Sequence, residues 1–318
     1  MKPEQKVLRL GSIMIIGAIL LRLLCYFPAT AGGAARLMVF LQTGRLLTST
    51  SQPAVEITAP TETVGITVHK PQRLSASFSP EDASLVKLLN TTSYQVDVES
   101  MLQQKLDWNL YDDEPTVLIL HAHATESYSG TKGYRSQDDT LNMISIGDRL
   151  AELLEEAGIG VIHDRTLHDE PSYSGSYTSA RASMKEYLAK YPSIQLVLDL
   201  HRDAAEDSQG NQIGYTLSTP QGDAAKLLLV VGTNAGGQNH PQWQKNMTLA
   251  VKLHAQLQKD APGICRSLQI RTSRFNQDLS PGALLVEMGT AGNTHEEAML
   301  AVEILAQSII ALSHGANL

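Results

Sequence analysis

The chain is poor in cysteine and in positive charge, and each shortage excludes a class of protein. Its 318 residues include two cysteines, Cys25 in an apolar segment and Cys265 in the polar part of the chain, so we expect no intrachain disulfide. The formal net charge is −8, and no basic stripe is visible. Because phosphate binding needs a basic surface, nucleic acid is excluded as a partner. The glycine pair Gly236-Gly237 is not followed by a Gly-Lys-Ser or Gly-Lys-Thr motif, which argues against a phosphate-binding loop.

One long apolar run stands near the amino terminus, at residues 10–27. As a helix it would be about 27 Å long, close to the apolar thickness of a bilayer. Arg22 interrupts the run near its outer end, from which a long side chain reaches the headgroups. Basic residues before the run place the amino terminus in the cytoplasm. We therefore expect a single-pass anchor in the cell membrane. The alternative is cleavage after Ala31, at a small-x-small pattern, and both readings place the rest of the chain outside the cytoplasm.

Composition divides the chain into three parts. Residues 1–30 are predicted to form a cytoplasmic tail and transmembrane signal anchor. Residues 31–110 are predicted to be an extracytoplasmic tether with a short helical segment, because Thr, Ser, Pro and Val dominate 48–70 without a sustained period. Residues 111–318 are predicted to be the catalytic domain, since a regular pattern of strands and helices starts after Pro115.

Strand and helix patterns alternate from Thr116 onward. Short apolar runs predict strands at 117–120, 159–162, 194–200, 226–232, 268–271 and 283–287. Other stretches predict helices at 141–157, 176–190, 242–259 and 294–312, and short helices earlier at 80–90 and 98–106. Continuous apolar strands between helices are typical of parallel sheets that are covered on both faces. The expected fold class is therefore α/β, with a mainly parallel sheet flanked by helices on both faces.

Three of these strands deliver polar residues that suit metal binding or proton transfer. His123 and Glu126 follow the first strand, His201 follows the strand at 194–200, and Glu287 ends the last. The carboxyl ends of parallel strands share one edge of the sheet, where ligands bind in such folds. Two His and one Glu are a common ligand set for a catalytic zinc, and Glu287 is then available as acid/base. The sequence therefore predicts a zinc hydrolase.

Each of these residues has a structural alternative. His123 and Glu126 are three residues apart and would face the same way on a helical turn, but they could also be ordinary loop residues. His121 competes with His123 as a ligand. His201 could be a half-buried histidine without a ligand, and Glu287 could form a structural salt bridge, because an unpaired buried acid is costly.

Two neighbours of His201 are candidate supporting residues. Asp199 could orient a histidine ligand through its other ring nitrogen. Arg202 could stabilise an oxyanion or bind a substrate carboxylate, because its planar guanidinium matches a carboxylate in shape.

Taken in order, the three segments resemble the stage II sporulation protein P family of spore-forming Firmicutes. The matching pieces are residues 121–128, 199–203 and 285–289, together with the short tail, the anchor and the tether. That family is similar to the zinc-dependent N-acetylmuramoyl-L-alanine amidases, whose fold is an α/β sheet flanked by helices. The resemblance implies that zinc is bound by His123, Glu126 and His201, and that Glu287 is the catalytic acid/base. The amidases carry their ligand Glu further downstream on a helix, so Glu126 departs from their pattern.

The resemblance also implies a reaction and its setting. The reaction is hydrolysis of the amide between N-acetylmuramic acid and L-Ala of the stem peptide in peptidoglycan, and family members are also described as endopeptidases that cut peptide cross-links. The setting is septal peptidoglycan thinning and engulfment during sporulation, with a lytic transglycosylase and a membrane scaffold as partners. Two alternatives stay open, namely a catalytically silent peptidoglycan-binding scaffold at the septum and a zinc endopeptidase.

Overall fold

The computed structural model describes residues 76–106 and 108–315, and a seven-stranded sheet forms the centre of this part. The strand order is β1-β8-β7-β9-β4-β2-β3. Neighbouring strands are parallel except β7 and β9, which pair antiparallel. The strands are β1 (Leu88–Asn90), β2 (Val117–Leu120), β3 (Val161–His163), β4 (Leu196–Asp203), β7 (Leu227–Gly232), β8 (Leu268–Arg271) and β9 (Ala283–Thr290). The predicted mainly parallel α/β sheet is therefore confirmed.

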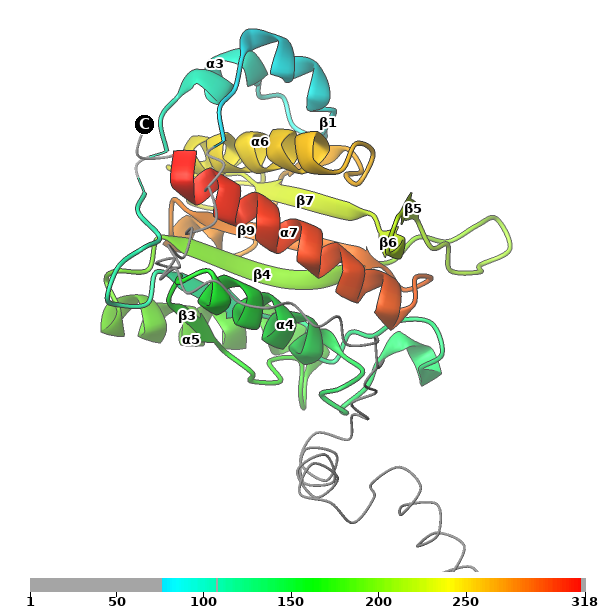
Figure 1. Cartoon of the computed structure of the whole chain (residues 1–318). Coiled ribbons are helices and arrows are strands. Elements are labelled where there is room, and N and C mark those ends of the chain that lie inside the picture. The colour runs from blue at the N-terminus through cyan, green and yellow to red at the C-terminus, as the bar shows by residue number, and fades with distance from the viewer. Residues whose placement is uncertain (1–75, 107, 316–318) are drawn as a thin grey trace, which may run out of the picture. The chain divides into compact units, whose positions relative to one another are not determined.

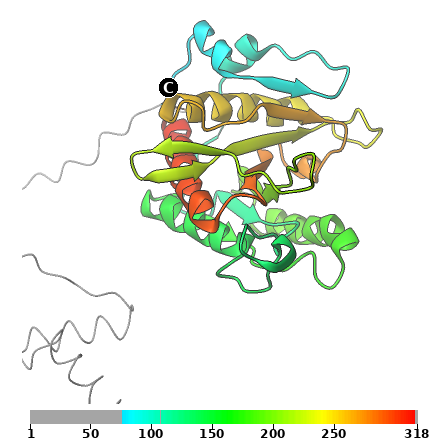
Figure 2. The same cartoon turned by 90° about the vertical axis from the view of Figure 1, so that its right-hand side faces the viewer.

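Helices cover both faces of this sheet. Figure 1 shows α7 between α4 and α6 on one face, and Figure 2 gives the side view of the layers. The other face is covered by α5, whose Ala180 and Met184 pack against Leu118 of β2. The helices are α3 (Val98–Gln103), α4 (Met143–Glu156), α5 (Ser176–Lys190), α6 (Trp243–Asp260) and α7 (His295–Gly315).

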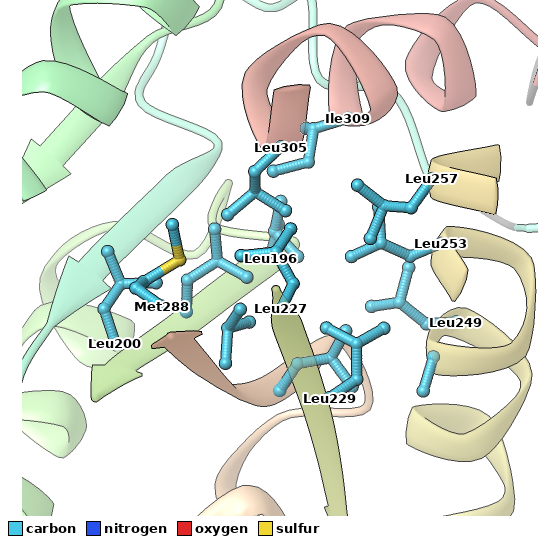
Figure 3. Close-up of a cluster of buried hydrophobic side chains, with 14 of the residues drawn as sticks. Leu196, Leu200, Leu227, Leu229, Leu249, Leu253, Leu257, Met288, Leu305 and Ile309 are labelled. Atoms are coloured by element: carbon cyan, nitrogen blue, oxygen red, sulfur yellow. The ribbon is translucent and has the colours of Figure 1, made fainter. Parts of the chain in front are cut away.

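The main core lies between the sheet and the helices α4, α6 and α7. Along β2, Val117 and Ile119 enter this core, whereas Leu118 and Leu120 enter the cluster under α5. Such alternation follows from the two-residue period of a strand. Every residue of β2 is buried, and for this reason its sequence is a continuous apolar run. The close-up in Figure 3 shows leucines of β4, β7, α6 and α7 meeting in the main core.

Helix α4 illustrates how local sequence sets the element bounds. The Asn142 side chain accepts a hydrogen bond from the backbone N–H of Ile144 and caps the amino end. Gly158, with φ of 85°, follows the carboxyl end in a left-handed conformation that suits glycine. Between them, Met143, Leu150 and Leu154 lie on the buried face.

Two features differ from the sequence expectation. The predicted helix at 80–90 is a 3₁₀ turn at Pro80–Leu85 followed by β1, which pairs with β8 at the edge of the sheet. A hairpin of β5 (Thr216–Thr219) and β6 (Gly222–Ala225) was not predicted. The expected anchor and the first part of the tether segment, up to residue 75, lie outside the described residues, whereas the rest of that segment, apart from residue 107, is described and includes β1 and α3. Within the described part of the chain, no helix has the length and apolarity needed to cross a membrane.

Candidate catalytic site

The structure brings together the four residues singled out from the sequence. His201 of β4 and Glu287 of β9 are register partners in adjacent strands. The Nδ1 atom of His201 lies 3.4 Å from Oε2 of Glu126, and the ring centroids of His201 and His123 are 5.3 Å apart. Three segments that are far apart in the sequence therefore meet at the carboxyl ends of β2, β4 and β9.

Glu126 is fixed by a tight turn after β2. Its backbone N–H donates to the carbonyl of His123 at 3.1 Å, which places the two side chains close together. Its Oε2 accepts a hydrogen bond from the backbone N–H of Arg202 at 3.1 Å. Burial raises the pKa of Glu126, but the contact with His201 and the charge of Arg202 outweigh burial, and the pKa lies below its usual value. Glu126 is therefore a buried carboxylate anion.

His201 lies between two buried carboxylates. Its Nε2 is 2.9 Å from Oδ1 of Asp199, a close ion-pair contact without hydrogen-bond alignment, and its Nδ1 faces Glu126. Asp199 is itself oriented by the backbone N–H of Ala122 at 2.8 Å. Burial lowers the pKa of His201, but Asp199 and Glu126 outweigh burial and raise the pKa well above its ordinary value. A positive charge at this position thus compensates the two carboxylates. The expected contact between Asp199 and a candidate ligand is present.

His123 is covered by aromatic side chains. The ring of Tyr173 stacks on it at 4.2 Å, and that of Tyr177 meets it edge-on at 5.4 Å. The guanidinium of Arg135 lies 4.3 Å from the centroid of Tyr173 and forms an ion pair with Asp169 at 3.1 Å. Burial lowers the pKa of His123, so its ring is neutral, and its buried Nδ1 has no hydrogen-bond partner among the described residues. The ring is therefore in the protonation state that a metal ligand needs.

Sequence reasoning missed this aromatic cover. Tyr173 and Tyr177 are four residues apart around the start of α5, a spacing that puts two side chains on one side of a helix. That spacing was the available signal, but nothing in the sequence shows which histidine the rings cover.

Glu287 has no salt-bridge partner in the part of the chain that the structure describes, so the structural alternative considered for it is not found. Its Oε2 is shielded from solvent and lacks a hydrogen-bond partner. Burial raises the pKa of Glu287 to about 8, with the neighbouring Glu126 adding to the shift and His201 opposing it. A carboxyl group that titrates near neutral pH is suited to proton transfer.

His121 points away from this cluster. Its Nδ1 lies 3.1 Å from the carbonyl oxygen of Leu200, and its Nε2 lies 2.8 Å from Nε2 of His163. Both ring nitrogens are engaged, and the side chain is fully buried. This arrangement favours His123 over His121 as the candidate ligand.

Arg202 has a structural role that was not considered from the sequence. Its guanidinium donates to the carbonyl oxygens of Ser127 at 2.8 Å and Tyr134 at 2.6 Å, so it fastens the loop that carries Glu126. Tyr128 is also buried and donates its hydroxyl to the carbonyl of Met288 at 2.9 Å. Both side chains thus bond to backbone carbonyls around the site.

No metal-binding cluster of three or more His, Cys, Asp or Glu side chains is present in residues 76–106 and 108–315. The candidate ligands contact one another instead. Their chemistry nevertheless fits a divalent cation, because His123 offers an unpaired neutral nitrogen beside the carboxylates of Glu126 and Asp199. The charged ring of His201 compensates these carboxylates, which is what a bound divalent cation would do at the same place.

Comparison with known proteins gives matches of two kinds. The stage II sporulation protein P of Bacillus subtilis (strain 168) is 30% identical over an aligned length of 211, and the match covers 61% of this chain and 50% of the relative. The chain therefore spans about half the length of this curated relative. Among solved structures, N-acetylmuramoyl-L-alanine amidase AmiC2 of Nostoc punctiforme is 14% identical with a TM-score of 0.36, over 64% of this chain and 95% of the other. The amidase of Clostridium difficile 630 is 13% identical with a TM-score of 0.36, over 63% and 97%.

Similarity to solved structures at these TM-scores supports no conclusion about activity. The family match is of a different kind, because it extends over most of the sequence. The model of the family described as Stage II sporulation protein P matches residues 55–310, which include every residue of the candidate site. The chain belongs to the stage II sporulation protein P family.

Proposed function

We propose that this chain is a zinc-dependent peptidoglycan hydrolase that acts in sporulation. The bond we assign to it is the amide between N-acetylmuramic acid and L-Ala of the stem peptide. The observation that carries the proposal is the position of Glu287. Its carboxyl group has a pKa near neutrality and lies across from His201, which in turn contacts Glu126. Family membership supports the setting, and the donor chemistry of the site supports the metal.

Zinc would be held by His123, Glu126 and His201, and His201 would release its extra proton on binding, because the cation takes over the compensation of the carboxylates. When bound, it would polarise the scissile carbonyl and make water more acidic, as in other zinc hydrolases. Asp199 would keep the ring of His201 oriented, because it contacts the second ring nitrogen. Arg202 would hold Glu126 in place through its backbone N–H.

Glu287 would move the proton. A cation near its carboxyl group lowers the pKa, which makes the carboxylate available as a base. Oε2 of Glu287 would take a proton from the attacking water and deliver it to the nitrogen of the leaving peptide. The free lone pairs of this buried oxygen are an arrangement that suits such a transfer.

We further propose that the protein is attached to the cell membrane by a single helix near its amino terminus, with the catalytic domain outside the cytoplasm. Thinning of septal peptidoglycan during engulfment is the proposed setting. A lytic transglycosylase and a membrane scaffold are proposed partners.

Product analysis tests this function. The full chain, supplied with zinc, is incubated with purified sacculi, and the soluble products are separated and identified by mass spectrometry. An amidase releases stem peptides with a free amino-terminal L-Ala and leaves glycan strands without peptides. Products that are cut only within the peptide cross-links would indicate an endopeptidase. Binding to sacculi without any released product, in the presence of zinc, would contradict the proposal and favour a silent binding protein.

A further inference from the structure

A cavity of about 330 Å³ adjoins the candidate catalytic site. It lies between the start of α5 and the loop that follows β8, and its lining includes Tyr177, Arg181, Gln238, Arg274, Phe275 and Asn276. Its volume is at the lower end of the range for small-ligand sites, about 300 to 1,000 Å³.

Tyr177 forms the wall between the cavity and the catalytic cluster. Its ring is stacked on that of His201 with centroids 6.1 Å apart, and it lies 6.1 Å from the ring of Phe275 on the cavity side. A substrate whose scissile amide is at His201 and Glu287 would pass Tyr177 to enter the cavity. Tyr177 therefore contacts the candidate catalytic cluster on one side and the cavity on the other.

The cavity carries an excess of positive charge. Arg181 donates from both terminal nitrogens to Asp278, at 2.8 and 2.7 Å, and so neutralises it. Arg274 shares the same carboxylate through a longer contact of 3.4 Å between Nε and Oδ1. The lining includes no acidic side chain, so one arginine charge is left uncompensated in a chain whose net charge is −8.

The loop that presents Arg274 is held in an unusual backbone conformation. Phe275 and Asn276 have φ of 49° and 57°, in the left-handed region that side chains rarely adopt. The Asn276 amide donates to the carbonyl of Tyr177 at 2.8 Å, and the side chain of Gln277 bonds to the backbone of β7. Strained backbone of this kind persists where surrounding contacts fix it, and it is concentrated at ligand sites.

We propose that this cavity binds a free carboxylate of the peptide part of the substrate and that Arg274 is the residue that receives it. Arg181 already uses two donors on Asp278, whereas Arg274 keeps most of its planar guanidinium for a carboxylate. The substrate class is thus a peptide stem with a free carboxylate rather than one whose carboxylates are amidated. This inference rests on the proposed function, because it assumes that the scissile amide lies beside Tyr177.

Binding of a peptide that cannot be cleaved tests the inference without hydrolysis. The probe is the tetrapeptide L-Ala-γ-D-Glu-L-Lys-D-Ala, which lacks the sugar amide, and its partner is the same peptide with both carboxylates converted to carboxamides. Calorimetry on the full chain should show tighter binding of the acid. In Arg274→Gln, the Kd for the acid should rise about tenfold, the usual order for a hydrogen bond to a charged group, with little change for the carboxamide.

Two further variants serve as controls. Arg274→Lys keeps the charge and should restore part of the affinity for the acid. Arg271→Gln makes the same charge change three residues away, at an exposed position that does not line the cavity, and should bind like the unaltered chain. Equal binding of acid and carboxamide, or equal effects of the changes at Arg274 and Arg271, would overturn the inference. If the chain binds the acid more tightly than the carboxamide but releases nothing from sacculi, the proposed hydrolysis is contradicted and the carboxylate site is not.

Discussion

His201 on β4 lies directly across from Glu287 on β9, as register partners in two parallel strands. Their separation in space is therefore set by main-chain pairing in the centre of the sheet. The register of the two strands shifts between His201 and Asp203, so the regular ladder ends at the candidate site. Irregular pairing of this kind is common next to active sites, because it re-aims the side chains that follow.

The zinc assignment makes a graded prediction. His201→Asn and His123→Asn should each weaken zinc binding by more than about 100-fold, because a ligand is lost. Asp199→Asn should weaken it by about 10 to 100-fold, because the histidine it contacts loses its orientation. His295→Asn, at a half-buried histidine outside the cluster, should have no effect. Metal titration of the four purified variants checks this order. Full zinc affinity in the His123 variant would reject that ligand.

The aromatic cover makes a second prediction. His123 is 7% exposed under the ring of Tyr173, which is itself 54% exposed. Tyr173→Ala should uncover His123 and speed its reaction with diethylpyrocarbonate several-fold, whereas Tyr173→Phe should keep the stack and the slow rate. Mass spectrometry of each histidine measures the rates, with His295 as the internal reference. An unchanged rate at His123 in the alanine variant would show that Tyr173 does not limit access.

Local sequence was sufficient to predict most elements but not their long-range partners. The bounds of β2, α5 and β8 agree with the predictions, because each is a strongly patterned run with clear ends. The antiparallel pairing of β7 with β9 was not predicted, since it joins segments about fifty residues apart that look alike in either direction. The β5–β6 hairpin was missed because its strands are short and only half of their residues are exposed, without a regular alternation in β6.

The same distinction holds at the candidate site. Residue type and position at strand ends were enough to select His123, Glu126, His201 and Glu287. The role of Arg202 could not be derived in this way, because its partners are backbone carbonyls of a loop some seventy residues earlier. A carbonyl has no signature in the sequence, so only the folded chain shows that this arginine bonds to these two carbonyls.

Gly147 in α4 packs closely against His121 and His163, and a substitution there tests how tightly this histidine pair is packed. A Cβ atom at this position would lie 2.6 Å from Nε2 of His121 and would also collide with His163. Gly-to-Ala changes in helix interiors usually stabilise by about 1 kcal/mol, whereas overpacking costs about 1 to 3 kcal/mol. We expect overpacking to dominate, so Gly147→Ala should lower the free energy of unfolding by about 1 to 2 kcal/mol. Urea unfolding measures it.

A double-mutant comparison isolates the cause. In a His163→Ala background one of the two collisions is removed, so the cost of Gly147→Ala should be smaller than in the unaltered chain. Equal costs in both backgrounds would mean that His163 plays no part in it.

The free energy of unfolding should fall in mild acid because of His254. It is buried on α6, and burial lowers its pKa to about 4. As pH falls from 6.5 towards 4, the unfolded chain takes up a proton that the folded chain refuses, so folding becomes less favourable by about 2 to 3 kcal/mol. Above pH 6.5 the histidine contributes no pH dependence, and below about 4 the loss is complete.

Urea unfolding at pH 7 and pH 4.5 checks this, with His254→Gln as the comparison. Glutamine can still donate to the carbonyl of Arg266, which His254 contacts at 3.2 Å, but it does not titrate. The variant should lose less stability between the two pH values. The same loss in both proteins would show that other groups are responsible.

The central claim is that Glu287 moves the proton while other residues hold the metal. The most direct measurement compares Glu287→Gln with the unaltered chain for zinc content and for release of peptides from sacculi, with Glu156→Gln, at an exposed position of α4, as the matched control. We predict that Glu287→Gln keeps its zinc and slows release by about 10² to 10⁴-fold, the usual contribution of a general acid/base, while Glu156→Gln changes neither. Release by Glu287→Gln at the rate of the unaltered chain would contradict the account.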